Sequence, residues 1–165
     1  MKTVKVVKSL EPEYIHRVIL NEKIMDYHRV AVALCYLSGI GPTHILRYRK
    51  RPGMRWGDIE SHGKRLVFRN RNGEIASTVL MEPEKPQEVD PIRWERVEAL
   101  EWQAYKTLED YAKQQEERGR YGGDKEIVGA DIDPINQNLY AKTGFTLSFY
   151  SESRRSHYNG SMPTE

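Results

Sequence analysis

Apolar residues recur at three- and four-residue spacing in several segments of the chain, which is the pattern of helices with one buried face. The first of these segments follows Ser9, a residue type that favours the N-cap position. The spacing also predicts helices over residues 25–37, 92–118 and 133–140. Gly39 and Gly144 stand where two of these helices should end, and Pro42 fits the first turn of a further short helix.

Extended segments are indicated at fewer places. Residues 66–68 and 75–80 are apolar runs on either side of Asn72-Gly73, and Asn-Gly in this position favours a β-hairpin. Residues 4–7 and 145–150 are further candidates for extended structure. Polar residues dominate from 151 to 165, so we expect a polar tail there.

Together these elements predict an α+β fold, a mostly helical single domain over residues 1–165 with one β-hairpin. Three prolines mark residues 82–91 as a linker. The linker joins an N-terminal half, residues 1–81, to the long helix and the C-terminal part, residues 92–165.

The formal net charge of +2 is small, but the charges are unevenly distributed. Residues 45–73 hold nine Lys and Arg against two Asp and Glu. Residues 82–132 hold fourteen Asp and Glu against eight Lys and Arg. This asymmetry favours one face for a polyanion and another for solvent or a basic partner.

Several classes of site are not indicated. Cys35 is the only cysteine, so an internal disulfide is impossible and a reducing, intracellular compartment is expected. The histidines lack metal-ligand spacing, and no Walker loop or dinucleotide fingerprint occurs, so we expect neither a metal nor a cofactor. No signal peptide or membrane span is indicated, which favours a cytoplasmic protein, or one at the host-cell nucleoid.

The most informative chemistry lies between the second helix and the hairpin. Gly39-Ile40-Gly41 forms a turn that could bring backbone N–H groups close to a phosphate. A basic cluster interleaved with Tyr48 and Trp56 follows: Arg47, Arg49, Lys50, Arg51 and Arg55. Cations with neighbouring aromatic rings are typical of nucleic-acid contacts, and a solvated loop is the alternative.

The order of these motifs resembles the catalytic domain of tyrosine recombinases, the phage integrase family. SLEPEYIHRVI is similar to the opening helix of that domain, and VALCYLSGIG is similar to the helix and turn before its first catalytic arginine. MRWGDIE is similar to its Trp-Asp segment, and GKRLVFRNRNGEIASTVLM to the hairpin that follows. The resemblance implies a tyrosine-recombinase-like α+β fold and double-stranded DNA as the partner.

The resemblance also implies a degenerate active site. Gly41 stands at the position of the first catalytic arginine, and the hairpin lysine falls near Arg69 or Arg71. SFYSESRRSH is similar to the His-x-x-Arg box, with Arg154 as its arginine and Ser151 in place of the histidine. If an activity is present, the catalytic groups would be Arg47, Arg154 and Tyr158. Arg69, Arg71, Arg154 and Arg155 join the candidate DNA contacts.

LSGIGPTHIL also resembles, more weakly, a helix-hairpin-helix motif, in which a Gly-x-Gly hairpin offers N–H groups to a DNA phosphate. We therefore expect a DNA-binding accessory or regulatory protein of a phage or mobile element, acting in DNA recombination and not itself an enzyme. One alternative is an active strand-transferring recombinase with an unusual or shared active site. Another is a protein–protein interaction module, and a protein partner or a homo-oligomer is compatible with each.

Overall fold

The computed structural model describes residues 9–70 and 72–159. Its helices are α1 (Pro12–Leu20), α2 (Asp26–Ser38), α3 (Pro91–Glu117), α4 (Ile132–Thr143) and α5 (Leu147–Asn159), with short 3₁₀ helices η1 (Pro42–His44) and η2 (Trp56–Asp58). Its strands are β1 (Ile59–His62), β2 (Arg65–Arg69) and β3 (Ile75–Leu80). The expected α+β class is confirmed. The strand expected at residues 4–7 and the candidate Arg71 lie outside the described residues.

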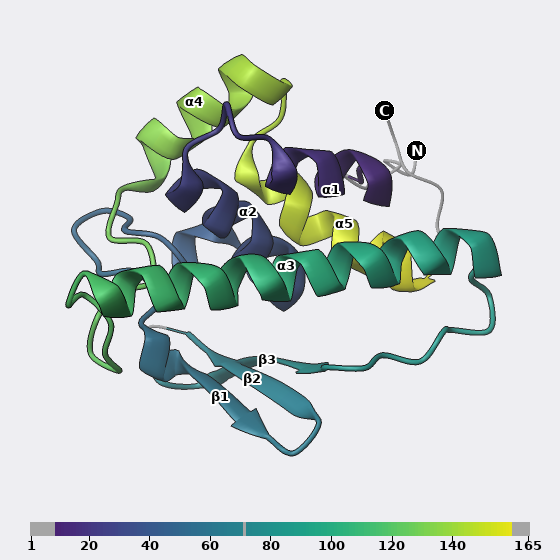
Figure 1. Ribbon diagram of the computed structural model, residues 1–165, viewed down its shortest axis with the longest axis horizontal. Coiled ribbons are helices and arrows are strands. Elements are labelled where there is room, and N and C mark those ends of the chain that lie inside the picture. The colour runs from purple at the N-terminus through teal and green to yellow at the C-terminus, as the bar shows by residue number, and fades with distance from the viewer. Residues whose placement is uncertain (1–8, 71, 160–165) are drawn as a thin grey trace, which may run out of the picture.

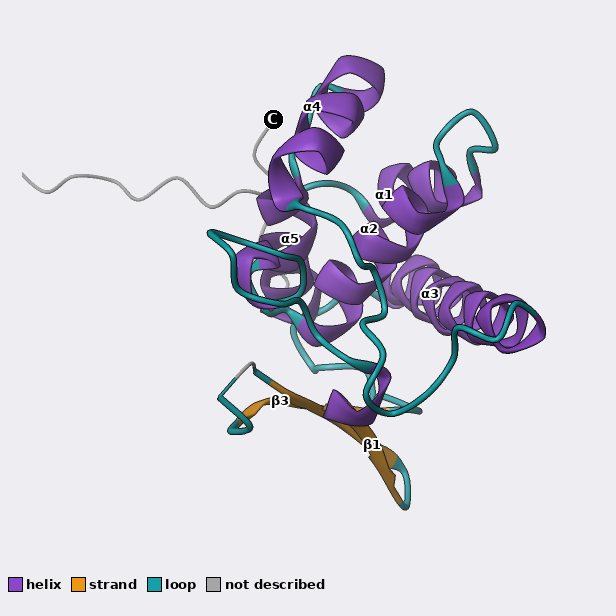
Figure 2. Ribbon diagram, turned by 90° about the vertical axis from the view of Figure 1, so that its left-hand side faces the viewer, coloured by secondary structure: helices purple, strands orange, loops and turns teal. Residues whose placement is uncertain are grey.

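Helix α2 is the centre of the fold. Its residues 30–38 are all buried, because α1, α3, α5 and β3 pack around it. Gly39 ends the helix in the left-handed conformation, with φ of 68°, as its position in the sequence predicted. Figure 1 shows the long helix α3 crossing in front of α2, with the sheet below. Figure 2 shows α3 and α5 on different flanks of α2, and the two helices meet where Arg154 of α5 pairs with Glu101 of α3.

The sheet is antiparallel with the order β1-β2-β3, so it contains one more strand than the expected hairpin. The hairpin of β2 and β3 lies where the sequence predicted it, and Gly73 takes a φ of 80° in its turn. Phe68 and Val79 turn inward and join the core below α2. Strand β1 was missed because Ile59 is its only apolar residue and its last two residues are exposed, so no alternation marks it.

The N-cap expected for the first helix is wrong, whereas the short helix expected at Pro42 is present. Helix α1 begins at Pro12 with Glu11 as its N-cap, and Ser9 is not a cap. Ser9 is instead buried, and its hydroxyl contacts the hydroxyl of Ser156. Pro42 does begin a helix, but this is the three-residue η1.

The largest correction concerns the C-terminal segment. Residues 147–159 form α5, so neither the extended stretch at 145–150 nor the polar tail from 151 is correct for this part. Ser151, Ser153 and Ser156 face the core on α5, and their hydroxyls donate to carbonyls of Ile40, Phe149 and Ser153 respectively. A helix that buries bonded serines in place of apolar side chains shows no apolar stripe, which is why the sequence did not indicate it.

Candidate nucleic-acid interface

The turn after α2 satisfies its own backbone donors. The Gly39 N–H donates to Cys35 O at 3.0 Å, and the Ile40 N–H donates to the Ser38 hydroxyl at 3.1 Å. Beyond Gly41 the chain enters η1, so the turn does not lead into a second α-helix. A Cβ added to Gly41 would meet no heavy atom within 4 Å. The N–H groups of Gly39 and Ile40 are therefore already hydrogen-bonded within the protein and are not free to bind a phosphate. The space beside Gly41 is open.

Arg47 forms an ion pair within the protein and is not a free cation. Its guanidinium donates from Nε and Nη2 to the carboxylate of Glu126, with an Nη2–Oε2 distance of 2.6 Å. The same carboxylate accepts the Gly53 N–H at 2.6 Å. Partial burial would raise the pKa of Glu126, but the hydrogen bonds from Arg47 and Gly53 hold that pKa below its ordinary value. The pair fixes the loop after η1 against residues 120–130.

The remaining cations of the basic cluster, unlike Arg47, form no ion pair in the described residues. Arg49, Lys50, Arg51 and Arg55 are exposed, and none has a carboxylate within 4.0 Å among the described residues. Arg49 lies over the ring of Tyr48, with 5.0 Å between its Cζ and the ring centroid. Trp56 packs between Tyr111 and Tyr121 and belongs to the edge of the core.

Of the hairpin candidates, Arg69 is the one the structure describes. It is half-buried and donates to Glu60 Oε1 at 3.2 Å and to Gly73 O at 2.9 Å. Arg71 lies outside the described residues. Arg69 therefore braces the turn of the β2–β3 hairpin as well as carrying charge.

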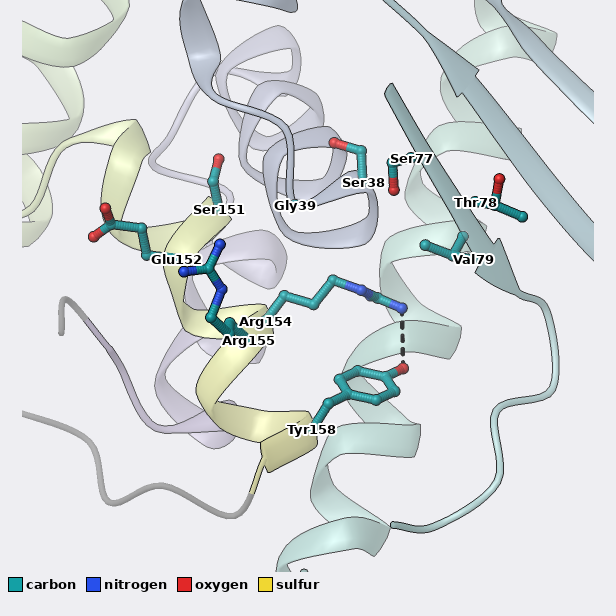
Figure 3. A pocket seen from close by; sticks show the side chains of 10 residues that line it. All are labelled: Ser38, Gly39, Ser77, Thr78, Val79, Ser151, Glu152, Arg154, Arg155 and Tyr158. Carbon is teal, nitrogen blue, oxygen red and sulfur yellow. Dashed lines mark hydrogen bonds between the residues drawn. The ribbon is translucent and has the colours of Figure 1, made fainter. Parts of the chain in front are cut away.

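Arg154 and Tyr158 line a cleft of about 290 Å³ between the end of α2, strand β3 and helix α5. Figure 3 shows both side chains projecting from α5 toward the space below Ser38 and Gly39. The Cδ of Arg154 lies 3.6 Å from the position that a Cβ of Gly39 would take. Arg155 lines the same cleft and is exposed.

Within this cleft Arg154 is already paired. Its Nη1 lies 2.6 Å from Glu101 Oε1, and its Nη2 donates to the Tyr158 hydroxyl at 3.0 Å. The Tyr158 hydroxyl in turn donates to Glu101. The guanidinium is stacked over the ring of Tyr158 at 4.5 Å and that of Tyr36 at 5.7 Å. Burial would lower the pKa of Arg154, but Glu101 raises that pKa above its ordinary value.

This arrangement is unfavourable for nucleophilic chemistry. Burial raises the pKa of Tyr158 well above its ordinary value, so the hydroxyl keeps its proton. Glu101 and Tyr158 occupy the Nη1 and Nη2 donors that Arg154 would offer to a phosphate. Arg47 does not join the cleft and lines two others. Of the three candidate catalytic groups, the structure thus brings together Arg154 and Tyr158 alone.

Sequence reasoning did not place two groups of this region in a site: Glu101 was not singled out, and His157 was assigned to the polar tail. Glu101 lies four residues after Val97 and three before Ala104, so an acid within the apolar stripe of α3 was the available signal. His157 is fully buried, with Nδ1 2.8 Å from the Tyr36 hydroxyl and Nε2 2.6 Å from Leu10 O. Because a carbonyl only accepts, Nε2 carries the proton and Nδ1 accepts from Tyr36. Burial lowers the pKa of His157 to about 4.

No family model, curated protein or solved structure matches this chain. Among residues 9–70 and 72–159, no group of His, Cys, Asp and Glu side chains could hold a metal ion. In the same ranges, no helix has the length and apolarity that crossing a membrane requires.

Proposed function

We propose that this protein binds double-stranded DNA and acts as an accessory or regulatory factor with a degenerate, tyrosine-recombinase-like site. The observation that carries the proposal is the set of exposed cations without a carboxylate partner in the described residues: Arg49, Lys50, Arg51 and Arg55. Free cations on one surface attract the phosphate backbone of nucleic acid without selecting its sequence.

The position of the acidic residues supports DNA binding at the loop that carries these cations. Arg49 and Lys50 at the tip of the loop lie beside residues 131–134 and not beside α3, whose C-terminal part lies near the loop at Arg47 and Trp56. In Figure 2, α3 lies at the right and α5 at the left. Helix α3 carries an exposed acidic face made of Glu95, Glu98, Glu109, Glu116 and Glu117. A polyanion is repelled by that face and attracted by the exposed cations of the loop, so the DNA lies away from α3.

The test is a titration of duplex DNA, followed by fluorescence anisotropy at several salt concentrations. We expect affinity to fall steeply with salt and to depend little on sequence. The triple variant Arg49→Ala, Lys50→Ala, Arg51→Ala should weaken binding to all duplexes. A matched control on α3, Arg96→Ala, Lys106→Ala, Lys113→Ala, removes the same charge and should weaken binding far less. Equal losses in the two variants, or an affinity that salt hardly changes, would contradict the proposal.

A second candidate function is DNA strand transfer, favoured by the meeting of Arg154 and Tyr158 in one cleft. The pairing of Arg154 with Glu101 argues against it, and so does the high pKa of Tyr158. We therefore predict no covalent protein–DNA adduct on a nicked suicide substrate. An adduct that forms with the wild-type protein and is lost in Tyr158→Phe would overturn this prediction and establish the enzyme.

A further inference from the structure

The loop between η1 and η2 contains a two-residue hairpin with an unusual backbone. The Arg51 N–H donates to Tyr48 O at 3.0 Å, and the Tyr48 N–H donates to Arg51 O at 3.2 Å. The two residues at its tip, Arg49 and Lys50, have φ of 50° and 66°. Two successive positive φ angles are the requirement of the type I′ turn, in which Asn-Gly is the favoured pair.

Arg49 and Lys50 are the two non-glycine residues with positive φ in the described part of the chain. A residue with a Cβ is disfavoured in this conformation, because the Cβ approaches the following carbonyl oxygen. At its other left-handed positions the chain uses glycine: Gly39, Gly63, Gly73, Gly119 and Gly144. The tip of this hairpin thus keeps two long cationic side chains where glycine or asparagine would fold more easily.

The base of the hairpin is held firmly. The Arg47 N–H donates to Ala130 O at 3.1 Å, and the Ile132 N–H donates to Arg47 O at 3.1 Å. On the other strand, the Met54 N–H donates to Ile45 O at 2.8 Å. Together with the Arg47–Glu126 ion pair, these bonds hold both sides of the loop, so the tip projects from a fixed support.

No carboxylate near the tip forms an ion pair with Arg49 or Lys50 in the described residues. Arg47, Tyr48, Arg49 and Lys50 line an open cleft together with Asp131 and Asp133. Neither aspartate is within ion-pair distance of Arg49 or Lys50. The two cations are therefore available to an outside anion, while the aspartates limit how deeply that anion can enter.

From these observations we infer that the Arg49–Lys50 tip is a preorganised pair of cations that contacts backbone phosphates of duplex DNA. The inference rests on the proposed DNA-binding function and assigns its principal contact. A turn that is already fixed loses little conformational entropy when it binds, which offsets the unfavourable backbone conformation of the free protein.

The test exploits the opposite effects that the inference predicts on folding and on binding. The variant Arg49→Asn/Lys50→Gly supplies the preferred turn residues and removes both charges. Its Tm should rise by about 3–6 °C because the strain is relieved. Its affinity for a duplex at low salt should fall about tenfold or more, and the slope of log K against log salt should become shallower by about 2, for two phosphate contacts.

The charge-conserving variant Arg49→Lys/Lys50→Arg is the matched control. It keeps both cations and both side-chain lengths nearly unchanged, so its Tm and affinity should stay close to those of the wild-type protein. If wild-type protein binds duplex DNA and Arg49→Asn/Lys50→Gly binds equally well, the inference is wrong and the proposed function stands. If wild-type protein binds no duplex, the proposed function itself fails. A Tm that is unchanged or lower in Arg49→Asn/Lys50→Gly would overturn the claim that the turn is strained.

Discussion

The ion pair between Glu101 and Arg154 should be a principal determinant of stability in the half of the molecule where α3 meets α5. The exposed fraction of the Glu101 side chain is 4%, and that of Arg154 is 12%. Glu101 also accepts from Tyr158, and its second oxygen, Oε2, is buried without a hydrogen-bond partner in the described residues. The substitution Glu101→Gln removes the negative charge while leaving the guanidinium in place.

Breaking a buried ion pair by changing one partner costs about 3–5 kcal/mol, because the remaining charge is buried without compensation. The glutamine amide can still accept from Tyr158, so the lower end of this range applies, a loss of about 3 kcal/mol. For a chain of this length, that loss corresponds to a fall in Tm of about 6–12 °C. The double variant Glu101→Leu/Arg154→Met replaces both charges by apolar groups and should lose much less, since no charge is left unpaired.

The assay is equilibrium unfolding in urea, followed by tryptophan fluorescence. Trp94 is a suitable reporter because its buried ring packs edge-on against Tyr158, with 5.2 Å between the centroids. A double-mutant cycle of Glu101→Leu, Arg154→Met and the double variant Glu101→Leu/Arg154→Met isolates the coupling between Glu101 and Arg154. A loss below about 1 kcal/mol for Glu101→Gln is the behaviour of a solvent-exposed pair, and it would refute the assignment of this ion pair to the protein interior.

Two further predictions concern the core. His157 stays neutral when folded, with a pKa of about 4, whereas the unfolded chain takes up its proton near pH 6.5. The free energy of unfolding should therefore fall by about 2 kcal/mol from this group between pH 6.5 and 5, and His157→Gln should lose that part of the pH dependence. Gly53→Ala should destabilise by more than about 1 kcal/mol in thermal unfolding, since its Cβ would lie 2.6 Å from Ile45 O, whereas Gly41→Ala should be nearly neutral.

Regular apolar spacing accounts for the elements that the sequence predicted well. Val97, Leu100 and Ala104 follow the helical period on α3, and all three are buried. The same reasoning failed for α5, whose buried positions include Ser153 and Ser156. Each of their hydroxyls donates to a carbonyl one turn earlier on α5, and each also contacts the segment before α1, at the Leu10 N–H and the Ser9 hydroxyl respectively. Polar side chains buried in this way have no counterpart in a hydropathy pattern.

The candidate site illustrates a second limit, which is that an arginine's role depends on its partner. The sequence identified Arg47 and Arg154 as candidates together with the other cations. Their carboxylate partners, Glu126 and Glu101, lie 79 and 53 positions away along the chain, too far for local spacing to indicate the pairs. Folding thus divides the arginines into those that hold the structure together and those that remain available.

This division sets the magnitude of the salt dependence. If all nine Lys and Arg of residues 45–73 met phosphates, the slope of log K against log salt would be about −8. Arg47 and Arg69 are held by glutamates, whereas four cations of the loop, Arg49, Lys50, Arg51 and Arg55, are exposed and without a carboxylate partner in the described residues. Counting these four and Arg155 of α5, and leaving out Lys64 and Arg65 at the β1–β2 turn, about four or five contacts are made by the loop and α5, which predicts a slope of about −4. A measured slope near −8 would mean that further cations contact DNA, either Lys64 and Arg65 or the paired Arg47. If Arg47 is among them, Glu126→Gln would strengthen binding by releasing it.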